Sequence, residues 1–238
     1  MLSCLHAQQQ FIAKGKIEFE KKVNILNQLK DQQEGDNSFM QMMIKTLPAV
    51  KTQYYDLYFN DTKTIYKPGK EVVGAQKIPD WIDGPANDNI VFTNLAMETS
   101  NSLKTVYEST FNIQDSLRKA DWKITDDTRT IAGFECRKAT TIIMDSVFVV
   151  AFYTDQILTT GGPESFSGLP GMILGLAIPR LHSTWFATKL ELVEVPETLL
   201  VAPKKGKKTN ITDLKTQLTP VMKNWGKMGQ KNMWQIMI

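Results

Sequence analysis

Residues of the types that acid–base or nucleophilic catalysis uses are scarce in this chain. The sequence contains two histidines and two cysteines, and His6 and Cys4 lie near the N-terminus, so His182 and Cys136 remain for the body of the chain. A Ser-His-Asp or Cys-His arrangement needs a histidine beside its nucleophile, and His182 stands alone in an expected turn. The sequence has no GxSxG, P-loop or GxGxxG motif. We therefore interpret His182 as a structural or solvated residue.

Sulfur-containing residues do not indicate a metal or redox site. Cys136 falls in the same alternating phase as Phe134, where a thiol packs as a small hydrophobe and is not a reactive thiolate. Met40, Met42 and Met43 could bind a soft metal such as Cu(I), but an apolar helix face with methionine as filler also explains their spacing. We expect neither a metal site nor a cofactor.

Two carboxylates could support hydrolysis. Asp155 and Glu164 lie close in sequence to a segment rich in glycine. A pair of carboxylates can act as general acid and general base if the fold brings both to one substrate. A carboxylate-dependent hydrolase is therefore an alternative function, although the sequence as a whole favours a protein that is not an enzyme.

The segment at 161–176 reads GGPESFSGLPGMILGL and is the most unusual motif of the chain. Its glycines permit positive φ and its prolines fix φ, which is typical of a rigid turn between strands. The alternative is an apolar loop that presents Phe166 and Leu169 to a ligand or partner. The candidate binding residues are Gly162, Pro163, Phe166, Gly168, Leu169, Pro170 and Gly171 in this loop, with Tyr55 and Tyr58 in an aromatic-rich segment.

Short segments of alternating hydrophobicity are expected to position these residues. Residues 15–23 put their apolar side chains on one face and most of their lysines and glutamates on the other, which predicts a half-buried strand. Residues 146–153, SVFVVAFY, are almost continuously apolar and predict a central strand covered on both faces. Over 25–47 the apolar residues change to the spacing of two short helices.

These segments predict a mainly β (α+β) fold with one large twisted antiparallel sheet or meander, short helices near the N-terminus and a C-terminal helix. Composition divides the chain further. The expected parts are a residual signal-peptide end at 1–10, an antiparallel β domain at 11–202, and a basic linker with a helical tail at 203–238.

The two ends of the chain carry separate signals. MLSCLHA, followed by three glutamines, resembles the end of a signal peptide, which predicts export; Cys4 as a lipid-attachment residue is the alternative. From Pro203 onward eight lysines accompany one aspartate, although the net charge of the whole chain is +3. In the tail helix we expect Thr212 as N-cap and a kink or split at Pro220. No window approaches the length of a membrane span.

Residues 168–173, GLPGMI, resemble the motif that names the GLPGLI family. The similarity extends to YDLYFN at 55–60, IAGFECRKA at 131–139 and AFYTDQI at 151–157, and it covers residues 11–220. The resemblance implies an exported protein of the bacterial envelope, often encoded beside outer-membrane transporter genes. It assigns no catalytic residues.

The leading hypothesis is a non-catalytic envelope protein, in the periplasm or associated with the outer membrane, that binds an apolar ligand or an outer-membrane transporter partner. This rests on the concave apolar face that a curved sheet offers. The alternatives are the hydrolase and a structural envelope protein tethered by its basic tail. We expect no nucleic-acid partner and at most peripheral envelope association. Leu169→Asp is predicted to abolish binding and to leave the fold intact.

Overall fold

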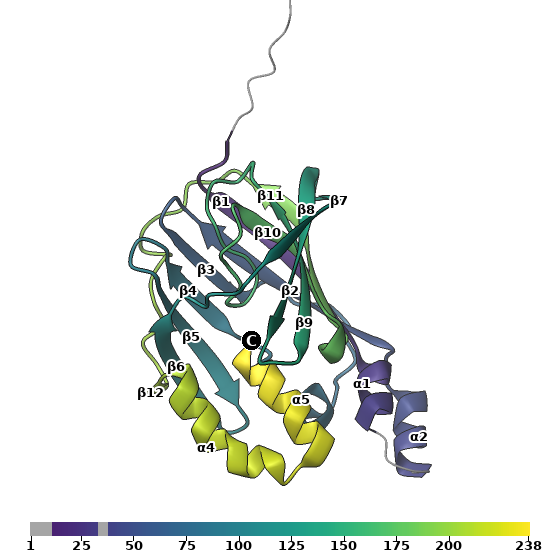
Figure 1. Cartoon of the computed structure of the whole chain (residues 1–238). Coiled ribbons are helices and arrows are strands. Elements are labelled where there is room, and N and C mark those ends of the chain that lie inside the picture. Colours follow the sequence, from purple (N-terminus) through teal and green to yellow (C-terminus); the bar gives the residue numbers. More distant parts are fainter. Residues whose placement is uncertain (1–10, 33–37) are drawn as a thin grey trace, which may run out of the picture.

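A single sheet of twelve strands forms the framework in the computed structural model, which describes residues 11–32 and 38–238 (Figure 1). The strands are β1 (Gly15–Asn24), β2 (Val50–Phe59), β3 (Lys63–Pro68), β4 (Ile90–Asn94), β5 (Thr99–Val106), β6 (Ser109–Ser116), β7 (Lys123–Ile131), β8 (Phe134–Ile143), β9 (Val147–Thr154), β10 (Met172–Ile178), β11 (Ser183–Glu191) and β12 (Lys207–Thr209). The helices are α1 (Ile25–Gln32), α2 (Ser38–Thr46), α3 (Asp80–Asp83), η1 (Pro179–Leu181), α4 (Ile211–Lys223) and α5 (Gly226–Met237). The prediction of a mainly β fold is confirmed.

The strand order places the first strand in the middle of the sheet. The order is β12-β6-β5-β4-β3-β2-β1-β11-β10-β9-β8-β7, and every pair is antiparallel except β12 with β6. Lys22 of β1 pairs with Thr52 of β2 on one side and with Thr184 of β11 on the other. Two meanders, β2 to β6 and β7 to β11, are therefore joined through β1.

The main core lies on one face of this sheet. In β9, Val147 and Val149 are fully buried, whereas Phe148 is 45% exposed. The prediction that β9 is covered on both faces is therefore wrong, because its alternate side chains reach solvent. The strand that is buried almost throughout is its neighbour β10, which includes the last residues of the GLPGMI motif.

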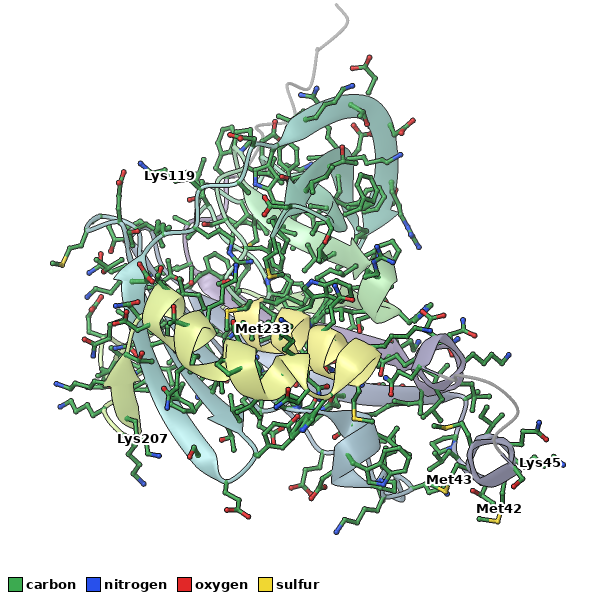
Figure 2. The ribbon with its side chains drawn as sticks, turned by 60° about the horizontal axis from the view of Figure 1, so that its bottom comes forward. Met42, Met43, Lys45, Lys119, Lys207 and Met233 are labelled. Atoms are coloured by element: carbon green, nitrogen blue, oxygen red, sulfur yellow. The ribbon has the colours of Figure 1, made fainter. Side chains whose placement is uncertain are left out.

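The two predicted helices near the N-terminus are present as α1 and α2. Ile25 and Leu29 of α1 are buried in a small cluster, and Met40 and Met43 of α2 pack against this cluster. Met42 points away and is 55% exposed (Figure 2). Packing thus explains two of the three methionines, and among the described residues no group of His, Cys, Asp or Glu has the arrangement of a metal site.

The basic tail folds back onto the sheet. β12 pairs with β6, and α4 and α5 follow as a helical pair (Figures 1 and 2). Asn210, and not Thr212, caps α4, because its side chain accepts from the Asp213 backbone N–H at 2.8 Å. Pro220 lies inside α4 without ending it, so the helix is not split at this residue and ends after Lys223; the alternative of a kink stays a prediction.

The last turn of α5 enters the interior of the molecule. Ile236, Met237 and Ile238 are all at most 4% exposed, and Ile238 belongs to the main core of the sheet. The predicted domain boundaries stay predictions, and residues 1–10, with Cys4 and His6, lie outside the described residues. Within 11–32 and 38–238, no helix combines the length and apolar character needed to cross a bilayer.

Candidate functional site

The loop that the sequence singles out packs inward. Phe166 and Leu169 are each 2% exposed and belong to the main core. Gly168 and Pro170 are the exposed positions of the loop, whereas the other candidate loop residues, Gly162, Pro163 and Gly171, are buried. The loop therefore has the rigid, structural role, and its apolar side chains are not presented to a ligand.

Close backbone packing explains the glycines of this loop. A Cβ on Gly171 would lie 2.1 Å from the Thr154 carbonyl oxygen, and one on Gly162 would lie 2.7 Å from the Ile173 side chain. The φ of Gly171 is +143°, which L side chains rarely adopt. Trp122, in the segment just before β7, fixes the loop, since its indole Nε1–H donates to the Ser167 carbonyl at 2.9 Å.

The two candidate tyrosines do not join the loop as one surface. Tyr55 is 1% exposed and stacks on Tyr66, with ring centroids 4.8 Å apart. Tyr58 is half-buried beside Lys16 and Lys67, whose ammonium groups lie 5.6 and 5.0 Å from its ring centroid. The sequence therefore placed these residues correctly in one strand but combined them into a binding surface that the structure does not have.

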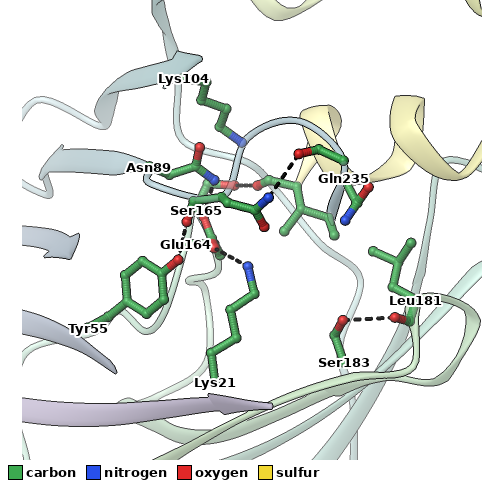
Figure 3. Close-up of polar contacts among 12 residues, drawn as sticks. Lys21, Tyr55, Asn89, Lys104, Glu164, Ser165, Leu181, Ser183 and Gln235 are labelled. Atoms are coloured by element: carbon green, nitrogen blue, oxygen red, sulfur yellow. Dashed lines mark hydrogen bonds and ion pairs between the residues drawn. The ribbon is translucent and has the colours of Figure 1, made fainter. Parts of the chain in front are cut away.

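Glu164 belongs to the same glycine-rich loop, and its side chain lies in the interior of the molecule. Its φ is 56° and it is 4% exposed. Asn89 donates to Glu164 Oε2 at 2.8 Å, and the Lys21 ammonium lies 3.8 Å from Oε1 (Figure 3). Lys21 also lies over the rings of Trp185 and Tyr55, at 5.0 and 5.6 Å from their centroids. A buried ion pair thus links the loop to the central strand β1.

Two further cations, the buried Lys104 and the half-buried Arg118, lie near this pair. Lys104 is 2% exposed and donates to the Ile236 carbonyl at 3.0 Å, while Arg118 donates to the Met237 carbonyl. Both cations therefore satisfy carbonyls at the C-terminal end of α5, where the helix dipole favours positive charge. Ser165, the residue after Glu164, donates to the Ile238 backbone oxygen.

Burial dominates the electrostatics of this centre. Desolvation lowers the pKa of Lys21 in spite of the nearby Glu164 carboxylate, and it lowers the pKa of Lys104 to about 8 and that of Arg118 to about 10. Burial raises the pKa of Tyr55 well above its ordinary value, with the Glu164 charge adding to the effect. The centre therefore holds more positive than negative groups away from water.

A polar cleft opens beside this buried centre. Its cavity measures about 790 Å³ and lies between β2, the end of β3 and the segment that carries α3. We call it the aspartate cleft and define it by its polar lining residues, which are Lys51, Thr52, Gln53, Tyr54, Tyr55, Lys70, Glu71, Gln76, Lys77, Asp80, Asp83 and Asp88. Lys51 pairs with Asp83 at 2.6 Å, and Lys70 lies over the Tyr54 ring at 4.2 Å.

The cleft and the buried centre are neighbours. Tyr55 belongs to the wall of the cleft, and its hydroxyl donates to the Asn87 carbonyl. The Asp83 and Asp88 charges raise the pKa of Lys21, although burial outweighs them. Beside Glu164 itself the free space is only about 10 Å³, the room of a single water. A substrate can therefore occupy the cleft but cannot reach Glu164.

Asp155 and Glu164 do not form a catalytic pair. Asp155 is exposed, while Glu164 is buried and held by Lys21 and Asn89. Cys136 is fully buried, and burial raises its pKa to about 11, which fits the packed-thiol interpretation. His182 contacts the Asp31 carboxylate at 2.6 Å.

Sequence reasoning missed the charged residues that matter most here. Lys21 occupies the same alternating phase as Ile17, Phe19 and Val23, so its inward position was visible in the pattern. Lys104 likewise shares its phase with Val106. The three aspartates of the cleft lie within residues 80–88, to which sequence reasoning assigned no role, and their number over so few residues was the available signal.

Comparison with known proteins places the fold. A family model described as "N-glycanase peptide, N-terminal domain" matches residues 58–216, more than half of the chain. Two solved structures of PNGF-II, in the C2 and P21 space groups, are similar to 86% of the chain with TM-scores of 0.55 and 0.54 and 15% identity in each case. The chain spans about a third of the length of those proteins (32% and 33%). No curated protein matches the chain.

These findings correct the leading functional hypothesis. The function as a non-catalytic protein that binds an apolar ligand is wrong, because the family that matches is that of an N-glycanase domain; an outer-membrane transporter partner is not tested by this match. The structure supports this correction, because Phe166 and Leu169, which were expected to form an apolar binding surface, are buried. The resemblance to the GLPGLI family stays a prediction.

Proposed function

This chain belongs to the family of N-glycanase N-terminal domains, and from that premise we propose that it serves the hydrolysis of N-linked glycans by binding the glycan-bearing polypeptide in the aspartate cleft. The polar residues among those that line the cleft carry the proposal. Sugar hydroxyls both donate and accept hydrogen bonds, so carboxylates, amides and lysines side by side suit them. Tyr54 adds a flat aromatic face with a polar tip.

The size and exposure of the cleft support a saccharide as ligand. A cavity of about 790 Å³ lies in the range of ligand sites, roughly 300–1,000 Å³. Asp80 and Asp88 are exposed in it, while Asp83 is held by Lys51. The chain covers about a third of PNGF-II, so we assign it the binding of substrate and not the cleavage of the glycan bond.

Hydrolysis within this chain is the second candidate. The observation that favours it is the presence of three aspartates in one accessible cleft, where a pair of carboxylates could supply a general acid and a general base. Such a reaction would use Asp80, Asp83 or Asp88. Asp155 and Glu164 are unsuited to it, because one of them is buried and locked in an ion pair.

Calorimetric titration with an N-glycosylated peptide tests the binding proposal. The glycosylated peptide should bind, and the same peptide without its glycan should not. Asp88→Asn keeps the shape of the side chain, removes a charge from the cleft and should weaken binding by about tenfold, or about 1.4 kcal/mol. Asp145→Asn, in an exposed turn outside the cleft, is the matched control and should leave the affinity unchanged. Equal affinity for both peptides would refute the proposal.

Mass spectrometry of the same glycopeptide separates binding from hydrolysis. After prolonged incubation with this chain alone, we expect the glycopeptide to remain intact. If the glycan is released, with conversion of the linked asparagine to aspartate, and Asp88→Asn abolishes the release, then the second candidate replaces the first. Release that survives in the Asp88→Asn variant would exclude the cleft from the chemistry.

Export is the cellular setting that we propose for this function. Membership of an N-glycanase family fits a protein that meets glycoproteins outside the cytoplasm. A place in the periplasm or at the outer membrane is the finer proposal, and the basic tail could assist peripheral association. Fractionation of the cells that naturally produce the protein tests it, with recovery in the cytoplasm as the contrary result.

A further inference from the structure

A second polar cavity lies where three distant segments meet. It measures about 320 Å³ and is bounded by α1, the turn around η1 and α5. The residues that matter are Gln28 and Gln32 of α1, Arg180 and His182 near η1, and Trp234 of α5. None of them belongs to the aspartate cleft, so this site stands apart from the proposed function.

Gln28 provides a fixed and unsatisfied acceptor in this cavity. The residue is 2% exposed, and its Nε2 donates to the Leu181 carbonyl at 2.7 Å. Because only the NH₂ group can make that bond, the orientation of the amide is set and Oε1 is the free end. Oε1 is buried and has no donor within the part of the chain that the structure describes, and the same is true of Gln32 Oε1. Buried acceptors of this kind ordinarily have a partner.

Arg180 and Trp234 form the other wall. The guanidinium carbon of Arg180 lies 5.4 Å from the centroid of the Trp234 ring. A guanidinium at this position can donate two parallel hydrogen bonds to a carboxylate. Among the described residues Arg180 has no ion pair with a carboxylate, because the Asp31 side chain is taken by His182 at 2.6 Å.

Positive charge dominates the surroundings. Lys231 is 6% exposed in the same wall and donates to the Ile82 carbonyl at 3.1 Å, and Lys227 also borders the cavity. Asp31 is the one acidic residue among the lining groups. A ligand for this site must therefore donate hydrogen bonds to amide oxygens, carry negative charge, and present a face that can lie near an indole ring.

We propose that this cavity binds a single sugar unit that carries a carboxylate, such as a uronic or sialic acid. Its hydroxyl groups would donate to Gln28 Oε1 and Gln32 Oε1, and its carboxylate would accept from the guanidinium of Arg180. The pyranose ring would pack beside Trp234. A volume of about 320 Å³ lies at the small end of ligand sites, roughly 300–1,000 Å³, which fits one sugar and not an oligosaccharide.

Titration with free sugars tests this inference without any glycopeptide. We expect glucuronic acid or N-acetylneuraminic acid to bind with a Kd on the order of 1 mM, and glucose, N-acetylglucosamine and acetate to bind at least about tenfold more weakly. If the neutral sugars bind with comparable affinity, then the carboxylate of the sugar is not recognised and the proposal is wrong. Comparable binding of acetate would remove the role of the sugar, and no saturable binding of any acidic sugar would overturn the site.

Two arginine variants locate the site. Arg180→Gln keeps most of the length of an exposed side chain and should weaken acidic-sugar binding by about tenfold. Arg137→Gln, at another exposed position on β8, is the matched control and should have no effect. Circular dichroism should show both variants folded. Unchanged affinity in Arg180→Gln would contradict the assignment, whereas failure of the glycopeptide experiment with Asp88→Asn would leave it standing.

Discussion

The Lys21 ammonium and the Glu164 carboxylate face each other inside the molecule, 3.8 Å apart, with only 8% and 2% of their side chains exposed. One belongs to the central strand and the other to the glycine-rich loop, so the pair joins segments that are far apart in sequence. Lys104 and Arg118 lie close enough to interact electrostatically with the same carboxylate. The Glu164 carboxylate therefore stabilises the positive charges of Lys104 and Arg118 as well as that of its ion-pair partner Lys21.

Loss of the Glu164 charge should destabilise the fold. Glu164→Gln leaves Lys21 buried without a counter-charge, which costs about 3–5 kcal/mol in comparable cases. The free energy of unfolding in urea measures the effect, with the exposed Glu108→Gln as control. The double variant with Lys21→Met should recover part of the loss. A single variant as stable as the parent would show that the pair contributes nothing.

Stability should rise with pH between about 8 and 10. Lys104 and Lys231 have pKa values near 8 in the fold and 10.5 in the unfolded chain. In this window the unfolded chain binds more protons, so the free energy of unfolding increases with pH, by on the order of 2 kcal/mol for a buried lysine. Burial lowers both lysine pKa values; Glu164 opposes this shift at Lys104, where Arg118 and Lys21 add to it, and Asp83 opposes it at Lys231.

Above pH 10 the rise should level off, because burial raises the pKa values of Tyr55, Tyr66 and Cys136, which oppose it, while Arg118, whose pKa burial lowers to about 10, extends it. The unfolded tyrosines then lose protons that the folded ones keep. Urea unfolding at about pH 7.5, 9.5 and 11 checks both windows, because these values bracket the shifted pKa values. Lys104→Met should flatten the first rise, and an equally steep rise in this variant would count against the assignment.

The two glycines of the motif turn should differ in their tolerance of alanine. Gly171→Ala drives a Cβ to 2.1 Å from the Thr154 carbonyl oxygen and should cost about 3 kcal/mol or more. Gly168 also has a positive φ, +91°, but its nearest neighbour would be 3.7 Å away, so Gly168→Ala should cost only about 1–2 kcal/mol. Thermal unfolding of the two variants compares them directly, and equal losses would mean that backbone contact is not the cause.

Leu169→Asp should unfold the loop and not merely abolish a binding surface. The side chain is 2% exposed in the main core, so an unpaired carboxylate there costs about 4 kcal/mol or more. Leu158→Asp, at a position that is 57% exposed, is the control and should stay within about 0.5 kcal/mol of the parent. A well-folded Leu169→Asp protein would mean that the loop opens readily.

Local patterns predicted the elements of this fold well. Alternation at residues 15–23 located β1 to within a residue, and the change of period after it located two short helices. These signals are local because side-chain direction in a strand or helix depends on neighbours in the sequence. The same reasoning failed for the covering of β9, since an apolar run reports hydrophobicity and not what lies against its second face.

The site could not be predicted from local patterns. The inward side of Lys21 was readable, but its partner Glu164 lies in a loop whose path depends on the packing of Gly171 against Thr154. The aspartate cleft needs β2 beside the segment of α3, and the second cavity needs α1 beside α5. Contacts between segments so distant in the chain are set by the order of strands in the sheet, which no local period encodes.

The central position of β1 also has a consequence for how the protein is made. β1 finds its first neighbour, β2, soon after it is synthesised, but its second neighbour, β11, begins only at Ser183. Until the ribosome has delivered β11, one edge of β1 remains open to unwanted pairing, and the two meanders cannot close into one sheet. Such distant pairing makes folding slow, so a chain truncated before β11 should aggregate rather than fold as a smaller sheet.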